Sequence, residues 1–220
     1  VEDHGGGIVP LNDVFNRDNA KTYSNSDQPH VFVASFTYDT PRIARNGFTR
    51  WALSHWNIGG VFRYSSGFPI RVPQAQNNLN ALLYQGTFMN RVPGEPLFLN
   101  GDFDPNKDFV LNPKAWADPA PGAWGTSATY YGDYRTARRP EEQINFGKTF
   151  PVNERMRFQI RFEFFNILNR TYLNNPDSTN ALATQKTDAT GKPVSGFGRI
   201  NTGSVFKPPR SGQMVLRFEF

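Results

Sequence analysis

The ten residues SGQMVLRFEF, Ser211 to Phe220, decide the fold class. Apolar residues alternate with mostly polar ones along this stretch, which is the pattern of a β-strand with one apolar face and one mostly polar face. The apolar face would carry Met214, Leu216, Phe218 and Phe220. The other face would carry Gln213, Val215, Arg217 and Glu219. An aromatic residue in the last position suits a membrane interface, where the ring enters lipid while the carboxylate stays wet. The stretch therefore predicts a transmembrane β-strand, although half-buried strands of soluble sandwiches alternate in the same way.

Composition excludes several classes of protein. No apolar run approaches the ~20 residues of a membrane helix, which excludes a helical membrane protein. Barrel strands need only ~9 to 11 tilted residues, so a mean hydropathy of −0.57 is compatible with a barrel. The chain has no cysteine, which excludes disulfide scaffolds, CxxC zinc sites and thiol catalysis. Its net charge of +5 is dispersed along the sequence and gives little support to nucleic-acid binding.

Four further segments alternate in the same way, and we expect strands at 30–39, 51–66, 143–150 and 156–168. Their predicted lipid-facing residues are Phe32, Phe36, Tyr38, Trp56, Ile58, Phe62, Tyr64, Ile144, Phe146, Phe158, Ile160, Phe162 and Phe164. The predicted lumen-facing residues, with those of the last strand, are Arg63, Arg157, Gln159, Arg161, Glu163, Gln213, Arg217 and Glu219. In a soluble sandwich the same charged residues would form the solvated face. Lys148 falls on the apolar side, which indicates snorkelling near a membrane edge or a local bulge.

The connections between these strands differ in length from one side to the other. Pro151–Arg155 is predicted to be a tight turn, and Thr40–Arg50 a moderate one. The other two connections, 67–142 and 169–210, are long and rich in Pro, Gly and Asn. Short periplasmic turns with long outer loops are typical of outer-membrane barrels, so the asymmetry favours a barrel over a soluble domain.

Five strands cannot close a membrane barrel. An open sheet edge in lipid would leave unpaired N–H and C=O groups that cost several kcal/mol each. We therefore expect the chain to be the C-terminal part of a larger all-β transmembrane barrel, with about five antiparallel strands. Its upstream strands and plug would belong to a longer precursor or to another chain.

Several motifs occur in an order that resembles the C-terminal barrel region of Oar-like TonB-dependent receptors. They are DQPHVFV at 27–33 with Tyr38 and Pro41, Trp56 with YSSGFP at 64–69, LNPKAW at 111–116, PAPG at 119–122, RFEFFNILN at 161–169, FGRI at 197–200, and Pro209-Arg210.

The resemblance implies a gated outer-membrane receptor or transporter of about twenty-two strands in a Gram-negative-type bacterium. It also implies an N-terminal plug, a coupling box that contacts TonB, and often a carboxypeptidase-regulatory-like domain. None of these N-terminal parts lies in the 220 residues, so we do not expect this segment alone to carry active transport. The resemblance further implies that Met214, Leu216, Phe218 and Phe220 are read by the barrel-assembly machinery, which suits strand addition at a sheet edge.

Two loop segments are weaker candidates for binding. Asp102, Asp104, Asn106 and Asp108 place oxygen ligands at alternate positions, as calcium loops do, but Lys107 and Pro113 break the EF-hand pattern, so a loop of Asx turns is favoured. A second segment mixes aromatic and basic groups that suit sugars or lipid phosphates: Tyr130, Tyr131, Tyr134, Arg135, Arg138 and Arg139. Packing of that loop against itself is favoured over ligand binding.

The residues leave three functional classes open. The first is a membrane receptor or transporter component. The second is an outer-membrane structural or adhesive barrel without active transport, and the third is a soluble β-sandwich binding module. The three histidines stand apart in sequence and indicate neither a zinc site nor a catalytic triad, so we expect no enzymatic activity and no cofactor.

Overall fold

The computed structural model describes residues 13, 15–41, 47–77, 86–99, 101–102, 104–203 and 207–220. The chain divides into two units. The first, which we call the loop unit, is Val1–Asp27, Gly67–Ala137 and Leu173–Val205. The second, the sheet unit, is Gln28–Ser66, Arg138–Tyr172 and Phe206–Phe220.

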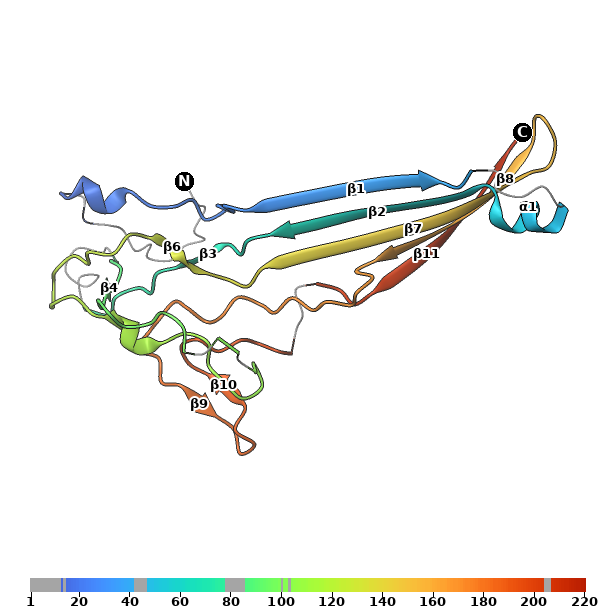
Figure 1. Ribbon diagram of the computed structural model, residues 1–220. Helices are drawn as coiled ribbons and strands as arrows, with labels where there is room; N and C mark the ends of the chain where they lie inside the picture. Colours follow the sequence, from blue (N-terminus) through green and yellow to red (C-terminus); the bar gives the residue numbers. More distant parts are fainter. Residues whose placement is uncertain are drawn as a thin grey trace. The chain divides into compact units, whose positions relative to one another are not determined.

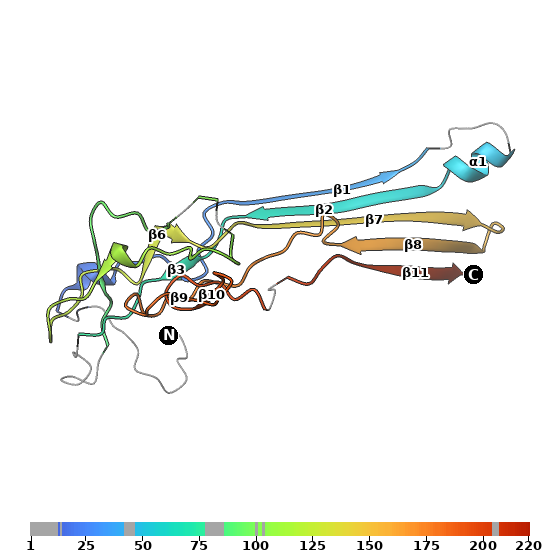
Figure 2. The ribbon, with the colours of Figure 1, turned by 90° about the horizontal axis from the view of Figure 1, so that it is seen from below.

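The sheet unit is built on five antiparallel strands that neighbour one another in chain order (Figures 1 and 2). They are β1 (Val31–Asp39), β2 (Trp56–Ser65), β7 (Arg139–Pro151), β8 (Arg157–Phe165) and β11 (Ser211–Glu219). Their order is β1-β2-β7-β8-β11. The all-β class and the five strands predicted from the alternation are confirmed. The strands have nine to thirteen residues. At about 3.3 Å per residue and a tilt of about 40°, nine to thirteen residues rise about 23–33 Å, which is comparable with an apolar band about 25 Å tall.

The turn between β7 and β8 is as tight as predicted. Pro151 pairs with Arg157, and the N–H of Val152 donates to the carbonyl of Met156 at 2.9 Å. The Asn153 side chain closes the turn, since its Oδ1 accepts the N–H groups of Arg155 at 2.9 Å and Met156 at 2.7 Å. The sequence therefore encodes this end of the hairpin locally.

The connection between β1 and β2 corrects two predictions. It contains a helix, α1 (Gly47–Leu53), where the sequence predicted a simple turn and the start of a strand at Trp51. The reversal into β2 uses His55, whose φ of 63° lies in the left-handed region, so the strand starts only at Trp56. In Figure 1 α1 lies at the end of the sheet where β8 begins and β11 ends. Among the described residues, no helix combines the length and apolarity that a membrane crossing requires.

The helices and strands in the described part of the loop unit are short. They are η1 (Arg17–Ala20), β3 (Pro69–Arg71), β4 (Asn90–Arg91), η2 (Pro113–Ala115), β5 (Trp116–Ala117), β6 (Tyr130–Arg135), β9 (Lys186–Thr187) and β10 (Pro193–Ser195). The paired strands are β3 with β6, β4 with β5, and β9 with β10. These elements lie largely in the two long connections, where the sequence predicted only loops.

The long connections share a hydrophobic core of their own. Its largest buried members include Phe88, Met89, Leu111, Trp116, Tyr134 and Phe197. Backbone hydrogen bonds join distant segments around it, such as the N–H of Val110 to the carbonyl of Gly198 at 2.9 Å. Gly198 has a φ of 81°, and a Cβ there would lie 2.6 Å from the backbone nitrogen of Leu111. The motifs at 111–116 and 197–200 therefore form structure rather than a ligand surface.

Candidate functional site

The register of the sheet gathers the predicted lipid-facing residues on one face. One row of paired residues runs across all five strands through Tyr38, Ile58, Phe146, Phe162 and Met214. Pairing is unbroken along each of the four interfaces, so side chains two residues apart stay on the same side. All thirteen predicted residues and Met214, Leu216 and Phe218 therefore share what we call the apolar face.

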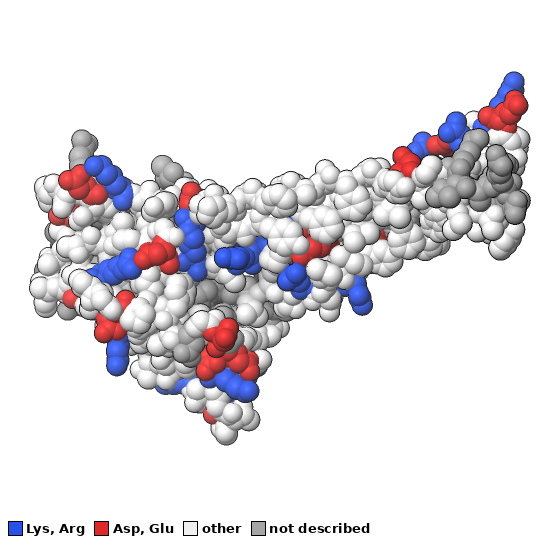
Figure 3. All heavy atoms as spheres, in the orientation of Figure 1, with Lys and Arg blue, Asp and Glu red and all other residues white. Residues whose placement is uncertain are grey.

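Large side chains on the apolar face pack against their neighbours, and many of them remain exposed on the side that points away from the sheet. The rings of Phe146 and Phe162 are 5.2 Å apart, and those of Phe36 and Phe62 are 6.1 Å apart. Phe32 is 62% exposed and Met214 57% exposed. The visible surface over β1 and β2 carries almost no charged side chain (Figure 3). Contiguous exposed apolar surface of this kind marks contact with lipid or with another protein.

The opposite face carries the eight predicted lumen-facing residues. Two ion pairs run along single strands, with 2.6 Å between Arg161 Nη2 and Glu163 Oε1 and 3.0 Å between Arg217 Nε and Glu219 Oε1. Between strands, the Gln213 side-chain amide donates to the Glu163 carboxylate. We call this side of the sheet the polar face. The two faces thus differ in chemistry across the full width of the sheet.

One carboxylate on the apolar face was missed by the sequence reasoning. Glu142 is fully buried, and its Oε1 lies 2.7 Å from Nε of Arg170. The predicted strand began at Gln143, whereas β7 begins at Arg139, so Glu142 lay outside the alternating window. Its even spacing from Ile144 and Phe146 was the signal that could have found it. An ion pair on an apolar face is tolerated because each charge has its partner.

Lys148 is the second charge on the apolar face, and its place excludes a bulge. The pairing of β7 with both neighbours continues without a shift through this residue. Its Nζ donates to the carbonyls of Trp51 at 2.5 Å and Ala52 at 2.8 Å, at the C-terminal end of α1. The same Nζ lies 4.8 Å from the Trp56 ring and 5.5 Å from the Phe150 ring. Helix carbonyls and ring faces stabilise a cation there, so Lys148 fastens α1 to the sheet.

The structure separates the six residues of the candidate ligand loop. Tyr134 is fully buried, with its ring 5.3 Å from that of Trp116, which corrects its assignment to a ligand surface. Tyr131 packs against the same core, while Tyr130 is half-buried at the start of β6.

The basic members of that set are also divided. The Arg135 guanidinium donates to the Asp27 carboxylate, and its Nη1 donates to the Asp27 carbonyl at 2.8 Å. Arg138 and Arg139 belong to the sheet unit. The favoured alternative, in which this stretch packs on itself, describes Tyr131, Tyr134 and Arg135.

The candidate calcium loop is organised by Asx turns. Asp104 Oδ1 accepts the N–H of Asn106 at 2.9 Å, and Asp108 Oδ2 accepts the N–H of Asp104 at 2.9 Å. The hydrogen bond from the Asn106 backbone holds the pKa of the Asp104 carboxyl below its usual range. Asp102 is exposed. Over the part of the chain that the structure describes, no three His, Asp or Glu side chains are grouped to hold a metal ion.

The residues nominated as an assembly signal lie at the end of the apolar face. Leu216 pairs with Ile160 and Phe218 with Phe158, while Met214 stands opposite Phe162. The Phe220 ring is 6.1 Å from that of Phe218 and is 95% exposed.

Comparison with known proteins agrees with this architecture. The family model described as "Outer membrane beta barrel domain" matches residues 2–213. Searches of curated proteins and of solved structures each gave no significant match. The matched range includes four complete strands of the sheet and nearly all of the loop unit. The family implies a location in the outer membrane of Gram-negative bacteria. The chain therefore belongs to the outer membrane beta barrel domain family.

Proposed function

We propose that the chain supplies part of the wall, the outer loops and an assembly strand of a gated outer-membrane receptor or transporter. The observation that supports this is the division of the sheet into an apolar and a polar face by one unbroken register. In the proposed arrangement the apolar face contacts acyl chains and the polar face lines an aqueous interior. Transferring a large apolar side chain out of water is worth about 1.5–3 kcal/mol, so lipid contact accounts for the composition of the apolar face.

The two edges of the sheet support a larger barrel. Among the described residues, β1 pairs only with β2 and β11 only with β8. The free edge of each strand carries backbone groups that lipid cannot satisfy, at several kcal/mol apiece. We propose that further strands of the same protein or of another chain pair with these edges, and that a plug fills the interior.

Single-cysteine labelling tests the orientation of the faces. The natural chain has no cysteine, so each introduced thiol is the only one in these 220 residues. Phe162→Cys and Arg161→Cys form a matched pair of adjacent β8 positions on opposite faces. In the membrane-embedded protein we expect a nitroxide at 162 to be relaxed by oxygen dissolved in lipid, and a nitroxide at 161 by a water-soluble nickel chelate. Equal access of the nickel chelate to both positions would refute lipid contact by the apolar face.

The resemblance to TonB-dependent receptors supports transport over a purely structural role. The competing reading is an outer-membrane structural or adhesive barrel. The coding sequence upstream of Val1 separates them, because a plug and a coupling box belong only to the receptor. If the coupling box is found, site-directed crosslinking to TonB in cells tests whether it is used. Absence of the plug and the coupling box would favour the structural barrel. We propose no catalytic role for the chain.

We also propose that β11 is the strand recognised during barrel assembly. Its apolar positions lie at an edge of the sheet, where strand addition by an assembly protein is geometrically open. Deleting Phe220 from the full-length protein is expected to lower the amount of barrel in the outer membrane, measured by heat-modifiable migration on gels. Wild-type amounts of folded barrel after the deletion would remove this part of the proposal.

A further inference from the structure

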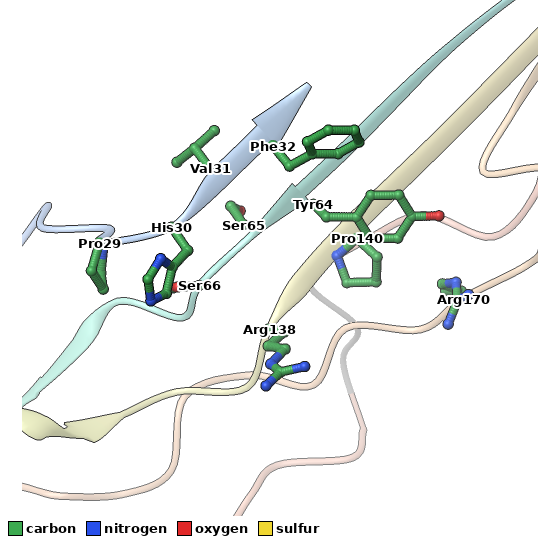
Figure 4. Close-up of a pocket in the computed structure, with 10 residues that line it drawn as sticks. All are labelled: Pro29, His30, Val31, Phe32, Tyr64, Ser65, Ser66, Arg138, Pro140 and Arg170. Carbon is green, nitrogen blue, oxygen red and sulfur yellow. The ribbon is translucent and has the colours of Figure 1, made fainter. Parts of the chain in front are cut away.

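A cavity of about 800 Å³ opens at one end of the sheet, where β1 and β7 begin and β2 ends (Figure 4). All residues that line it belong to the sheet unit. One wall is apolar and consists largely of Phe32, Tyr64 and Pro140, which continue the apolar face. This end is opposite the tight turn at 152–156, so in the proposed barrel it lies at the outer surface of the membrane.

Two arginines line the cavity beside this apolar wall. Arg138 is exposed, and it forms no hydrogen bond or ion pair with other residues that the structure describes. Arg170 contacts Glu142 through Nε, which leaves the two terminal guanidinium nitrogens for another ligand. In Figure 4 Arg138 lies below Pro140, and Arg170 lies to its right, below the hydroxyl end of Tyr64. A guanidinium can donate two parallel hydrogen bonds to a phosphate, which makes arginine the side chain of choice for phosphate groups.

The surrounding charges favour an anionic ligand. The segments 138–142, 165–172 and 207–211 of the sheet unit carry five cationic side chains and two carboxylates, a formal excess of three positive charges. One of the two carboxylates, Glu142, is already paired with Arg170. Lys207 is held nearby, since its Nζ donates to the carbonyl of Pro140 at 3.1 Å and to the hydroxyl of Tyr172 at 3.3 Å.

We propose that this cavity binds a phosphate-bearing lipid of the outer leaflet. The phosphate lies against Arg138 and Arg170, and an acyl chain lies along Phe32 and Tyr64. An apolar wall that ends at the Arg138 guanidinium and the terminal nitrogens of Arg170 matches an amphiphile better than a free anion, which would leave the apolar wall in water. This assignment rests on the proposed membrane orientation, because it requires the cavity to be level with lipid headgroups.

Native mass spectrometry of the full-length protein in mild detergent tests the assignment. The probes are a phosphorylated glycolipid of the lipid A type, the same glycolipid without phosphates, and inorganic phosphate as a competitor. Arg138→Gln is the test variant, since Arg138 has no partner among the described residues whose loss would disturb folding. Arg155→Gln, an exposed arginine in the turn at the other end of the sheet, is the matched control.

We expect the phosphorylated glycolipid to bind the wild-type protein at least tenfold more tightly than its dephosphorylated form, and Arg138→Gln to remove most of that difference. Arg155→Gln should bind like the wild type. Equal binding of both glycolipids, or an unchanged preference in Arg138→Gln, overturns the proposal. Displacement of the lipid by millimolar inorganic phosphate overturns the choice of a lipid over a free anion. The cysteine labelling of positions 161 and 162 reports separately on the membrane orientation, so a failure of the lipid site can be distinguished from a failure of the orientation on which it rests.

Discussion

Replacing Arg170 by methionine should be far more damaging than replacing Glu142 by glutamine, although the two residues form one ion pair. Glu142 is fully buried on the apolar face, whereas the Arg170 side chain is 46% exposed. In Arg170→Met the carboxylate loses its partner 2.7 Å away and stays buried. Breaking a buried pair in this way costs about 3–5 kcal/mol, and we expect about 3 kcal/mol because Arg170 is partly solvated. In Glu142→Gln the partly exposed Arg170 guanidinium can turn to water, and we expect a cost of about 1 kcal/mol.

The double variant Glu142→Gln/Arg170→Met tests whether the stability lost in Arg170→Met comes from leaving the Glu142 carboxylate without its partner. Without either charge, the buried site holds only neutral groups of similar size, so most of the loss should be recovered and the double variant should lie within about 1 kcal/mol of Glu142→Gln. The expected difference of about 2 kcal/mol between Arg170→Met and Glu142→Gln is roughly a thirtyfold change in the folding equilibrium constant.

Urea unfolding of the protein in lipid vesicles, followed by tryptophan fluorescence, measures all three free energies. Equal costs for Arg170→Met and Glu142→Gln would contradict the role given to the buried carboxylate. A double variant no more stable than Arg170→Met would also contradict it, because then no uncompensated carboxylate caused the loss.

Three further predictions concern other contacts of the structure. Lys148→Met removes both hydrogen bonds that Nζ donates to the end of α1, so amide hydrogen exchange of residues 47–53 should rise at least tenfold while the strands stay protected. Mass spectrometry measures this exchange, and an unchanged rate would show that Lys148 does not hold the helix. Tyr134→Ala empties the core of the loop unit and should cost about 3–5 kcal/mol of its stability, measured by thermal unfolding; a loss under 1 kcal/mol would contradict full burial. Burial raises the pKa of Tyr172 from 10.0 to about 12, so the neutral form is favoured in the folded state and stability should fall as pH rises from 10 to 12. The tyrosinate absorbance of the wild type minus that of Tyr172→Phe gives this pKa, and a midpoint near 10 would disagree with it.

The strands of the sheet could be predicted because apolar and polar residues alternate along each of them, which assigns each residue to one face. A period of two needs no knowledge of distant partners, and the register then follows from keeping each face uniform. Alternation failed to predict a residue whose position on a face depends on a partner distant in sequence. Glu142 breaks the apolar pattern at a point where Arg170, 28 positions later, compensates it. Predicting the position of Arg170 would have required the path of the chain after β8.

The helix α1 and the core of the loop unit could not be predicted from the sequence for a second reason. α1 has seven residues, too few for a periodic signal, and it depends on Lys148 from a strand far along the chain. Proline, glycine and asparagine in the long connections indicate where the backbone turns, but not which turns pack together. Leu111 and Trp116 could be recognised as a motif, while their burial against segments beyond residue 173 could not.

The order of segments in the loop unit has a consequence for biogenesis. Its core combines residues of 67–137 with residues of 173–205, and the whole β7–β8 hairpin is synthesised between them. The backbone bond from Val110 to Gly198 closes a span of 88 residues that contains this hairpin. Contacts so distant in sequence form late, because the entropy of closing the intervening chain must be met first. The core of the loop unit can therefore close only after the whole β7–β8 hairpin has been synthesised, so we expect its formation to be a late step of folding.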